Sequence, residues 1–229
     1  MRAHAEVVAT RTGLARVRSE APLTLRHAAG ELWLVSSAAG PLGGDDLCLD
    51  LEVGPGAHLT VRTVAAAVVL PGTSHWTVTA RVAPGAVLEF RPEPTVVASG
   101  ADHHLDFHAD VAAGGRLVLR EELVLGRYGE CGGRVTARTT VDLAGAPLLR
   151  HEVRLDGADP LTASPAVLGP ARAYGTVLRC GEPAGVRDPG SPPRTGPGWA
   201  VLTLDGPGEL LTAIAATAGE LRRLLDGQS

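Results

Sequence analysis

A segment of 29 residues recurs along the middle of the chain and constrains its fold more than any other feature. The matching positions carry the same kinds of residue, glycine on glycine and aliphatic on aliphatic. They are Val53, Val82 and Val111; Gly56, Gly85 and Gly114; Leu59, Leu88 and Leu117; and Val61, Phe90 and Leu119. A fixed period of this length indicates that one small structural unit is stacked several times.

Each unit contains a turn signal between two apolar segments. The turns are Gly54–Gly56, Ala83–Gly85 and Ala112–Gly114, and a weaker fourth unit centres on Ala144 and Gly145. Proline presets φ and glycine accepts positive φ, so these residues favour a reversal of the chain. We therefore interpret each unit as a strand, a tight turn and a second strand.

The residues beside the turns alternate between apolar and polar. Leu47, Leu49, Leu51 and Val53 fall on one face of a strand, and the residues between them fall on the other. This period of two is typical of half-buried strands. The sequence thus predicts an all-β fold, mainly antiparallel, with layered sheets built from repeated hairpins and a small C-terminal helical segment. The repeat is as consistent with simple duplication as with an extended binding surface, and by itself assigns no function.

The length of 229 residues fits one β domain spanning residues 1–229. Residues 181–199 are rich in proline and glycine and predict an exposed loop. A short strand is expected over residues 200–204 and a helical tail over residues 208–226. An apolar stripe in that tail could pack on the chain's own sheet, which we favour, or dock a partner. Its members are Leu210, Leu211, Ile214, Ala218, Leu221, Leu224 and Leu225.

Composition and charge exclude several classes of function. The net charge is −4 and no basic run occurs, which argues against a nucleic-acid partner. The apolar runs are too short to cross a membrane, and the N-terminal residues do not resemble a signal peptide. Cys48, Cys131 and Cys180 form no CxxC pair, so we expect a reducing, cytoplasmic environment. The chain has no lysine and no GxSxG, P-loop or HExxH motif, so we expect it not to be an enzyme.

One segment, Asp102–Asp110, is rich in side chains that bind metals. On a strand, His104, Asp106, His108 and Asp110 project from one face, and imidazole is a ligand for nickel, copper and zinc. The same alternation also fits a solvated polar face opposite a core face. We list His104, Asp106 and His108 as candidate metal ligands and leave both interpretations open.

Glu121 is a further candidate. It continues the apolar register of Leu117, Leu119 and Leu123, so its carboxylate is expected to be partly buried. A buried carboxylate needs a partner or a polar channel. Glu121 could line the path of an ion or form a salt bridge with an arginine, whereas Glu122 and Arg120 are expected to form a surface ion pair.

Several short motifs, in this order, resemble the UreD (UreH) family of urease accessory proteins. They are Gly43-Gly44-Asp45, the Val53–Ala57 turn, Pro92–Thr95 with Pro94 and Thr95, and Leu125–Glu130 with Gly126, Arg127 and Glu130. The resemblance covers roughly residues 40–150. Where the family tends to have a polar T-Q-x-x-T-K stretch, this chain has the apolar run from Thr63 to Leu70, so no role is carried over to those positions.

The resemblance implies a non-catalytic scaffold that binds apo-urease and the accessory proteins UreF and UreG and assists insertion of nickel. It implies no tightly bound cofactor, only transient Ni²⁺ passing weak successive ligands. By residue type, candidates for such ligands are Asp45, Asp46, Glu93, Glu121 and the Asp102–Asp110 segment. Two alternatives remain at this point: a metal-dependent hydrolase using His104, Asp106 and His108, and an all-β protein-binding module.

Overall fold

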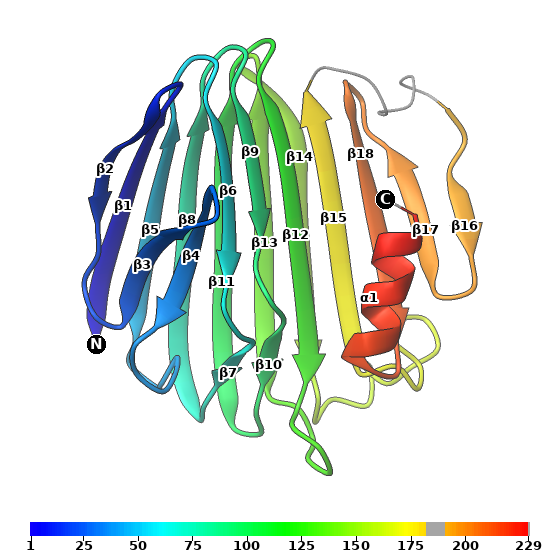
Figure 1. Ribbon diagram of the computed structural model, residues 1–229. Coiled ribbons are helices and arrows are strands. Elements are labelled where there is room, and N and C mark those ends of the chain that lie inside the picture. The colour runs from blue at the N-terminus through cyan, green and yellow to red at the C-terminus, as the bar shows by residue number, and fades with distance from the viewer. Residues whose placement is uncertain (182–190, 229) are drawn as a thin grey trace.

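The computed structural model describes residues 1–181 and 191–228 of the chain. Within these residues the chain forms two facing β-sheets and one short C-terminal helix (Figure 1). The predicted all-β class is therefore confirmed. The sheets, however, are mixed rather than mainly antiparallel, because the strands of the repeat pair in parallel.

The first sheet has seven strands in the described residues. Their spatial order is β14 (Ala146–Asp156), β13 (Arg134–Leu143), β11 (Ala101–Val111), β8 (Gly72–Val82), β5 (Asp46–Val53), β1 (Arg2–Thr10) and β2 (Gly13–Arg18).

The second sheet lies in front of the first in Figure 1. Its order is β16 (Arg194–Gly196), β17 (Trp199–Thr203), β18 (Gly208–Ala215), β15 (Ala173–Gly181), β12 (Arg116–Leu125), β9 (Val87–Arg91), β6 (His58–Thr63), β4 (Glu31–Ser36) and β3 (Leu23–Ala28). Two short strands, β7 (Ala67–Val69) and β10 (Thr95–Val97), follow β6 and β9 and pair with each other, and β10 also pairs with β12.

In both sheets, the parallel strands of the repeat pair residues that are 29 positions apart in the sequence. In the first sheet Val53 pairs with Val82, and Val82 pairs with Val111. In the second sheet Leu59 pairs with Leu88, and Leu88 pairs with Leu117. Equivalent residues of successive units are thus direct neighbours, which stacks like on like as in other repeat proteins.

The turns of the repeat do not form hairpins, and this part of the prediction was wrong. Each turn carries the chain from one sheet to the other, as from β5 to β6, so the two strands face each other across the core. The turns also stack, because the Gly56 amide donates to Pro84 and the Gly85 amide donates to Gly114. A hairpin and such an arch use the same turn residues and the same alternation, so the local sequence does not distinguish them.

The fourth unit is a true hairpin. β13 and β14 pair antiparallel within the first sheet. Ala144 and Gly145 at the turn have φ values of 51° and 80°, as a two-residue turn of type I′ requires. The repeat therefore ends here, and the chain does not cross to the second sheet at this turn.

The apolar faces of both sheets form the core. Leu47, Leu49, Leu51 and Val53 are all buried, which confirms the predicted inward face. They belong to one cluster with Leu88 and Leu117 of the second sheet. A second cluster nearer the other end of the sandwich contains Leu123, Val135 and Leu155.

The C-terminal region differs from the prediction. Residues 208–215 form strand β18, and only α1 (Ala218–Gly227) is helical. Thr217 caps α1 in a capping box with Glu220. Leu221 and Leu225 pack with Val177 and Leu211 on the outer face of the second sheet, so the helical part of the apolar stripe is covered by the chain itself.

The expected loop over residues 181–199 is described only in part. Residues 182–190 lie outside the described residues, and Arg194–Gly196 form β16, which pairs with β17. The strand expected over residues 200–204 is β17, within one residue at each end. In the described part of the chain, no helix has the length and apolar character needed to span a membrane.

Gly43 and Gly72 allow two segments of the backbone to approach each other closely. A Cβ atom on Gly72, which has φ +104°, would lie 2.7 Å from the Cα atom of Gly43. Gly129 also has positive φ, +74°, but a Cβ there would meet nothing within 4 Å. Gly43, one of the motif residues, is thus required by this close approach.

We predict that Gly72→Ala lowers the free energy of unfolding by roughly 2–4 kcal/mol, since left-handed strain adds to overpacking. Gly129→Ala serves as the control and loses only about 1–2 kcal/mol from strain. Urea unfolding of both variants measures the difference, and equal losses would show that the Gly43 contact has no energetic weight.

Candidate functional site

A cavity of about 480 Å³ opens between the two sheets. Its walls are mainly apolar and come from both sheets. They include Leu34, Leu47, Trp76, Phe90 and Phe107. Every residue of the apolar run from Thr63 to Leu70 except Val69 also lines the cavity, so this run forms part of its wall.

The cavity lies where the second sheet is interrupted. Phe90 of β9 pairs with Leu119 of β12, and Thr95 of β10 pairs with Leu123 of β12. The segment from Phe90 to Thr95 therefore contains one residue more than the segment of β12 that it faces. The extra residue bulges the segment between β9 and β10 away from β12, as in a β-bulge. A similar interruption separates β6 from β7.

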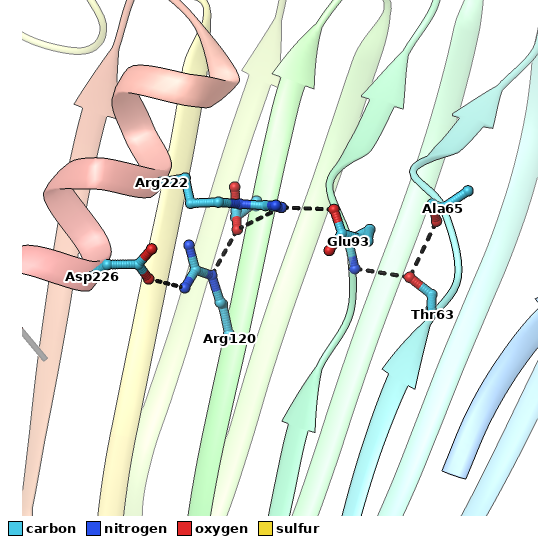
Figure 2. Close-up of polar contacts among 7 residues, drawn as sticks. Thr63, Ala65, Glu93, Arg120, Arg222 and Asp226 are labelled. Atoms are coloured by element: carbon cyan, nitrogen blue, oxygen red, sulfur yellow. Dashed lines mark hydrogen bonds and ion pairs between the residues drawn. The ribbon is translucent and has the colours of Figure 1, made fainter. Parts of the chain in front are cut away.

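Thr63 bridges these two interruptions. Its Oγ1 accepts a hydrogen bond from the backbone N–H of Glu93 (2.8 Å) and donates one to the carbonyl of Ala65 (3.1 Å), as Figure 2 shows. These bonds replace ladder bonds that the bulged segments cannot make. The position of Glu93 beside the cavity is thereby fixed.

On the outer face of the second sheet, a network of charges joins β12 to α1 (Figure 2). Glu122 is 2% exposed and accepts a hydrogen bond from Arg120 Nε at 2.6 Å. Arg222 of α1 lies 3.6 Å from Glu122 and donates to Glu93 at 2.7 Å, and Arg120 donates to Asp226 at 2.6 Å. The predicted Arg120–Glu122 pair is therefore present but buried rather than on the surface.

Glu121 projects to the opposite face of β12, toward the cavity, as its register with Leu117 and Leu123 predicted. It makes no hydrogen bond or ion pair with any residue in the described ranges, so the salt bridge considered from the sequence is not found there. Burial raises the pKa of this carboxyl to about 7, because its charged form has lost water.

A polar row extends from Glu121 through the core. Thr176 pairs with Glu121, and Thr212 pairs with Thr176, on three neighbouring strands of the second sheet. Tyr174, two residues from Thr176, contacts His151 of the first sheet, with its hydroxyl 3.3 Å from His151 Nε2. Glu121, Thr176 and Thr212 thus lie between the two apolar clusters.

The Asp102–Asp110 segment is β11, and its alternation is as predicted. His104 and Asp106 are half-buried and His108 is exposed, all on the outer face of the first sheet. Asp106 lies 3.6 Å from Arg138, and Asp102 lies 3.7 Å from His104. Among the described residues no group of three or more His, Cys, Asp or Glu side chains is gathered as a ligand set.

His103 projects inward instead and is buried. Its Nδ1 lies 2.8 Å from the hydroxyl of Ser74, 29 residues earlier in the chain. Burial is the main cause that lowers the pKa of His103 to about 4, so the imidazole is neutral near pH 7. Ser74 and His103 are neighbours because the 29-residue register pairs them between β8 and β11.

The remaining acidic candidates lie apart from one another. Asp45 is buried and accepts hydrogen bonds from the Met1 amino group (2.7 Å) and the Leu42 amide (2.8 Å). Asp46 lies on the outer face of the first sheet, 3.7 Å from Arg2. Of the acidic candidates, Asp45, Glu93 and Glu121 are among the residues that line the cavity.

The other motif residues have structural partners. Pro94 accepts a hydrogen bond from Ala67, and Thr95 begins β10. Arg127 donates to Glu130 at 2.6 Å, and the Ser99 amide donates to Glu130 at 2.5 Å. Gly126, with φ +77°, turns the chain out of β12. These residues shape the loop beyond β12.

Sequence reasoning missed three side chains that hold this region together. Arg172 donates to the carbonyls of Leu125 and Glu130 and fixes the loop after β12. Thr63 and Arg222 were also missed. Nothing in the local sequence marks these residues, because their partners are distant in the chain.

Comparison with known proteins gives consistent results. A family model described as UreD urease accessory protein matches residues 1–227. A protein named Urease accessory protein UreD from Frankia casuarinae is 40% identical over 259 residues, covering 99% of this chain and 81% of the relative. Similar proteins with that name occur in Frankia alni, with 45% identity over 84% of this chain and 70% of the relative, and in Streptomyces coelicolor, with 37% identity over 99% and 95%.

The charge network yields one prediction. Arg222→Ala removes a partner from buried Glu122 and should lower the free energy of unfolding by about 1–3 kcal/mol. Arg223→Ala, on the exposed side of the same helix, should change it by less than about 0.5 kcal/mol. Urea unfolding tests both, and equal effects would mean that helix propensity rather than the network accounts for the loss.

Glu121 yields a second prediction, on pH. Its pKa is about 7 in the folded chain against a reference value of 4.5. The stability it contributes is therefore full below pH 4.5 and is lost as pH rises through 7, by up to about 3 kcal/mol. Relative to the wild type, Glu121→Gln should gain stability progressively across this window and then level off.

Unfolding in urea at several pH values between 4.5 and 8 measures this difference. Glu52→Gln, at an exposed position of β5, is the matched control. His103 titrates equally in all three proteins and cancels in the comparison. A constant difference between Glu121→Gln and the wild type at every pH would contradict the prediction.

Proposed function

The chain belongs to the UreD urease accessory protein family, and from this premise we propose that it is a non-catalytic, cytoplasmic scaffold for urease maturation. In this role it binds apo-urease together with UreF and UreG and assists insertion of nickel into the urease active site. The observation that carries the proposal is the match over almost the whole chain to the family and to relatives named as urease accessory proteins.

The fold supports a scaffold role. In-register stacking of the repeat builds the two sheets as layers around a shared core. Such a body holds its loops and outer faces in fixed positions, which partner proteins need for specific docking. The outer face of the first sheet presents rows of charged and polar side chains, among them Asp106, Arg138 and Glu152.

The cavity supports a part in nickel transit. A path for an ion needs weak ligands in succession, since a complete ligand cage would retain the ion. Glu121 faces the cavity without an ion-pair partner in the described residues, and Glu93, whose carboxylate accepts a hydrogen bond from Arg222, borders the cavity. The ion is the cargo here, held transiently, and the chain needs no resident cofactor.

The test is reconstitution of urease in cells that lack the chain's own gene. Co-expression of urease subunits, UreF, UreG and this chain should give nickel-loaded, active urease and a complex recovered by pull-down on the chain. Omission of the chain should leave apo-urease. Equal urease nickel content with and without the chain would contradict the proposal.

The outer-face candidates are tested separately. Replacing His104, Asp106 and His108 together by Ala, Asn and Ala should lower the nickel bound per chain, because this variant removes every candidate ligand of the segment, whichever of them binds the ion. His27→Ala, at an exposed position of β3, is the control. Unchanged nickel stoichiometry and unchanged urease activation in the triple variant would rule out a role for this segment.

A further inference from the structure

The repeat register places two histidines side by side on the outer face of the first sheet. His75 of β8 and His104 of β11 are 29 residues apart and are direct partners in the parallel pairing. Their ring centroids are 4.8 Å apart, and the ring planes differ by 16°, so the imidazoles stack. His75 is exposed and the His104 side chain is 28% exposed, so solvent reaches both rings.

Carboxylates flank this pair on both sides. Asp46 of β5 is the partner of His75 in the pairing of β5 with β8. Asp102, two residues before His104 on the same face, has its Oδ1 3.7 Å from His104 Nε2. Each of these carboxylates also has an arginine nearby, Arg2 at 3.7 Å from Asp46 and Arg134 at 3.9 Å from Asp102. We therefore assign them the role of orienting the imidazoles rather than that of ligands.

The spacing of the two rings suits a shared ion. Two nitrogens bound to one ion at about 2.0–2.1 Å lie roughly 3–4 Å from each other. With their ring centroids 4.8 Å apart, the two side chains are close enough for one nitrogen of each to approach the same ion.

Residues along β11 are less suited to share an ion with His104. Successive same-face positions on a strand are about 6.6 Å apart, so His108 is about 13 Å from His104. Asp106, the position between them, is engaged by Arg138 at 3.6 Å. The nearest imidazole to His104 is therefore on the neighbouring strand, not on its own.

We propose that His75 and His104 together bind one divalent ion of borderline softness, with the remaining positions of the ion left to water or to a ligand of another protein. In the described residues no three His, Cys, Asp or Glu side chains are placed to hold an ion together, so Asp46 and Asp102 do not complete a ligand set and the site is open. Two imidazole ligands select nickel, copper or zinc over magnesium or calcium. Open positions suit an ion that is acquired and passed on.

The identification of the ion as nickel cargo rests on the proposed function, but the ligand pair does not. The test therefore uses the isolated full-length chain, purified without a histidine tag, and NiCl₂ alone. Isothermal titration should show one site whose affinity falls at least about tenfold in His75→Ala and in His104→Ala. Electron paramagnetic resonance of bound Cu²⁺ should show two nitrogen ligands in the wild type and fewer in either variant.

His108→Ala is the matched control, since it removes an imidazole from the same strand and face. It should leave the affinity unchanged. An equal loss in His108→Ala and His104→Ala, or no loss in His75→Ala, would overturn the proposal. Urea unfolding confirms that each variant is folded, and urease activation is not part of the readout, so failure here is distinct from failure of the proposed function.

Discussion

The in-register stacking of a 29-residue unit determines the rest of this structure. Because equivalent residues of successive units are paired neighbours, Val53 packs beside Val82 and Leu59 beside Leu88, and every arch repeats the one before it. The same register brings Ser74 to His103 and His75 to His104. The repeat thus builds the core and also generates the pairs of polar side chains on either face of the first sheet.

The cavity exists because the regular stacking is interrupted in the second sheet, after β6 and β9. An extra residue between β9 and β10, and the interruption between β6 and β7, open the second sheet beside β12. Backbone groups freed there are bonded by Thr63, and the outer side is tied to α1 by Arg222. Glu121 and Glu122, adjacent in sequence, consequently have opposite roles: one faces the cavity without a counter-ion among the described residues, and the other is buried in an ion network.

Much of this could be predicted from the sequence. The period of two correctly gave the inward face of β5 and the inward direction of Glu121, because alternation depends only on local strand geometry. The arches were taken for hairpins because Gly54–Gly56 serves either connection equally well, and only the pairing of distant strands decides. Residues 208–215 were assigned to the helical tail because Leu210, Leu211 and Ile214 also fit a helical spacing, whereas pairing with β15 makes them a strand. The partners of Arg222 and Arg172 follow from long-range contacts that no local pattern encodes.

The structure is a two-layer β fold whose faces and cavity depend on the stacked register. That register can be measured directly with pyrene labels on pairs of exposed positions, in a background lacking Cys48, Cys131 and Cys180. Labels at positions 81 and 110, which are partners on neighbouring strands, should give excimer fluorescence. Labels at positions 52 and 58, on either side of the first arch and on opposite outer faces, should give none. Excimer emission from positions 52 and 58, without emission from positions 81 and 110, would show hairpins in place of arches and would contradict the account.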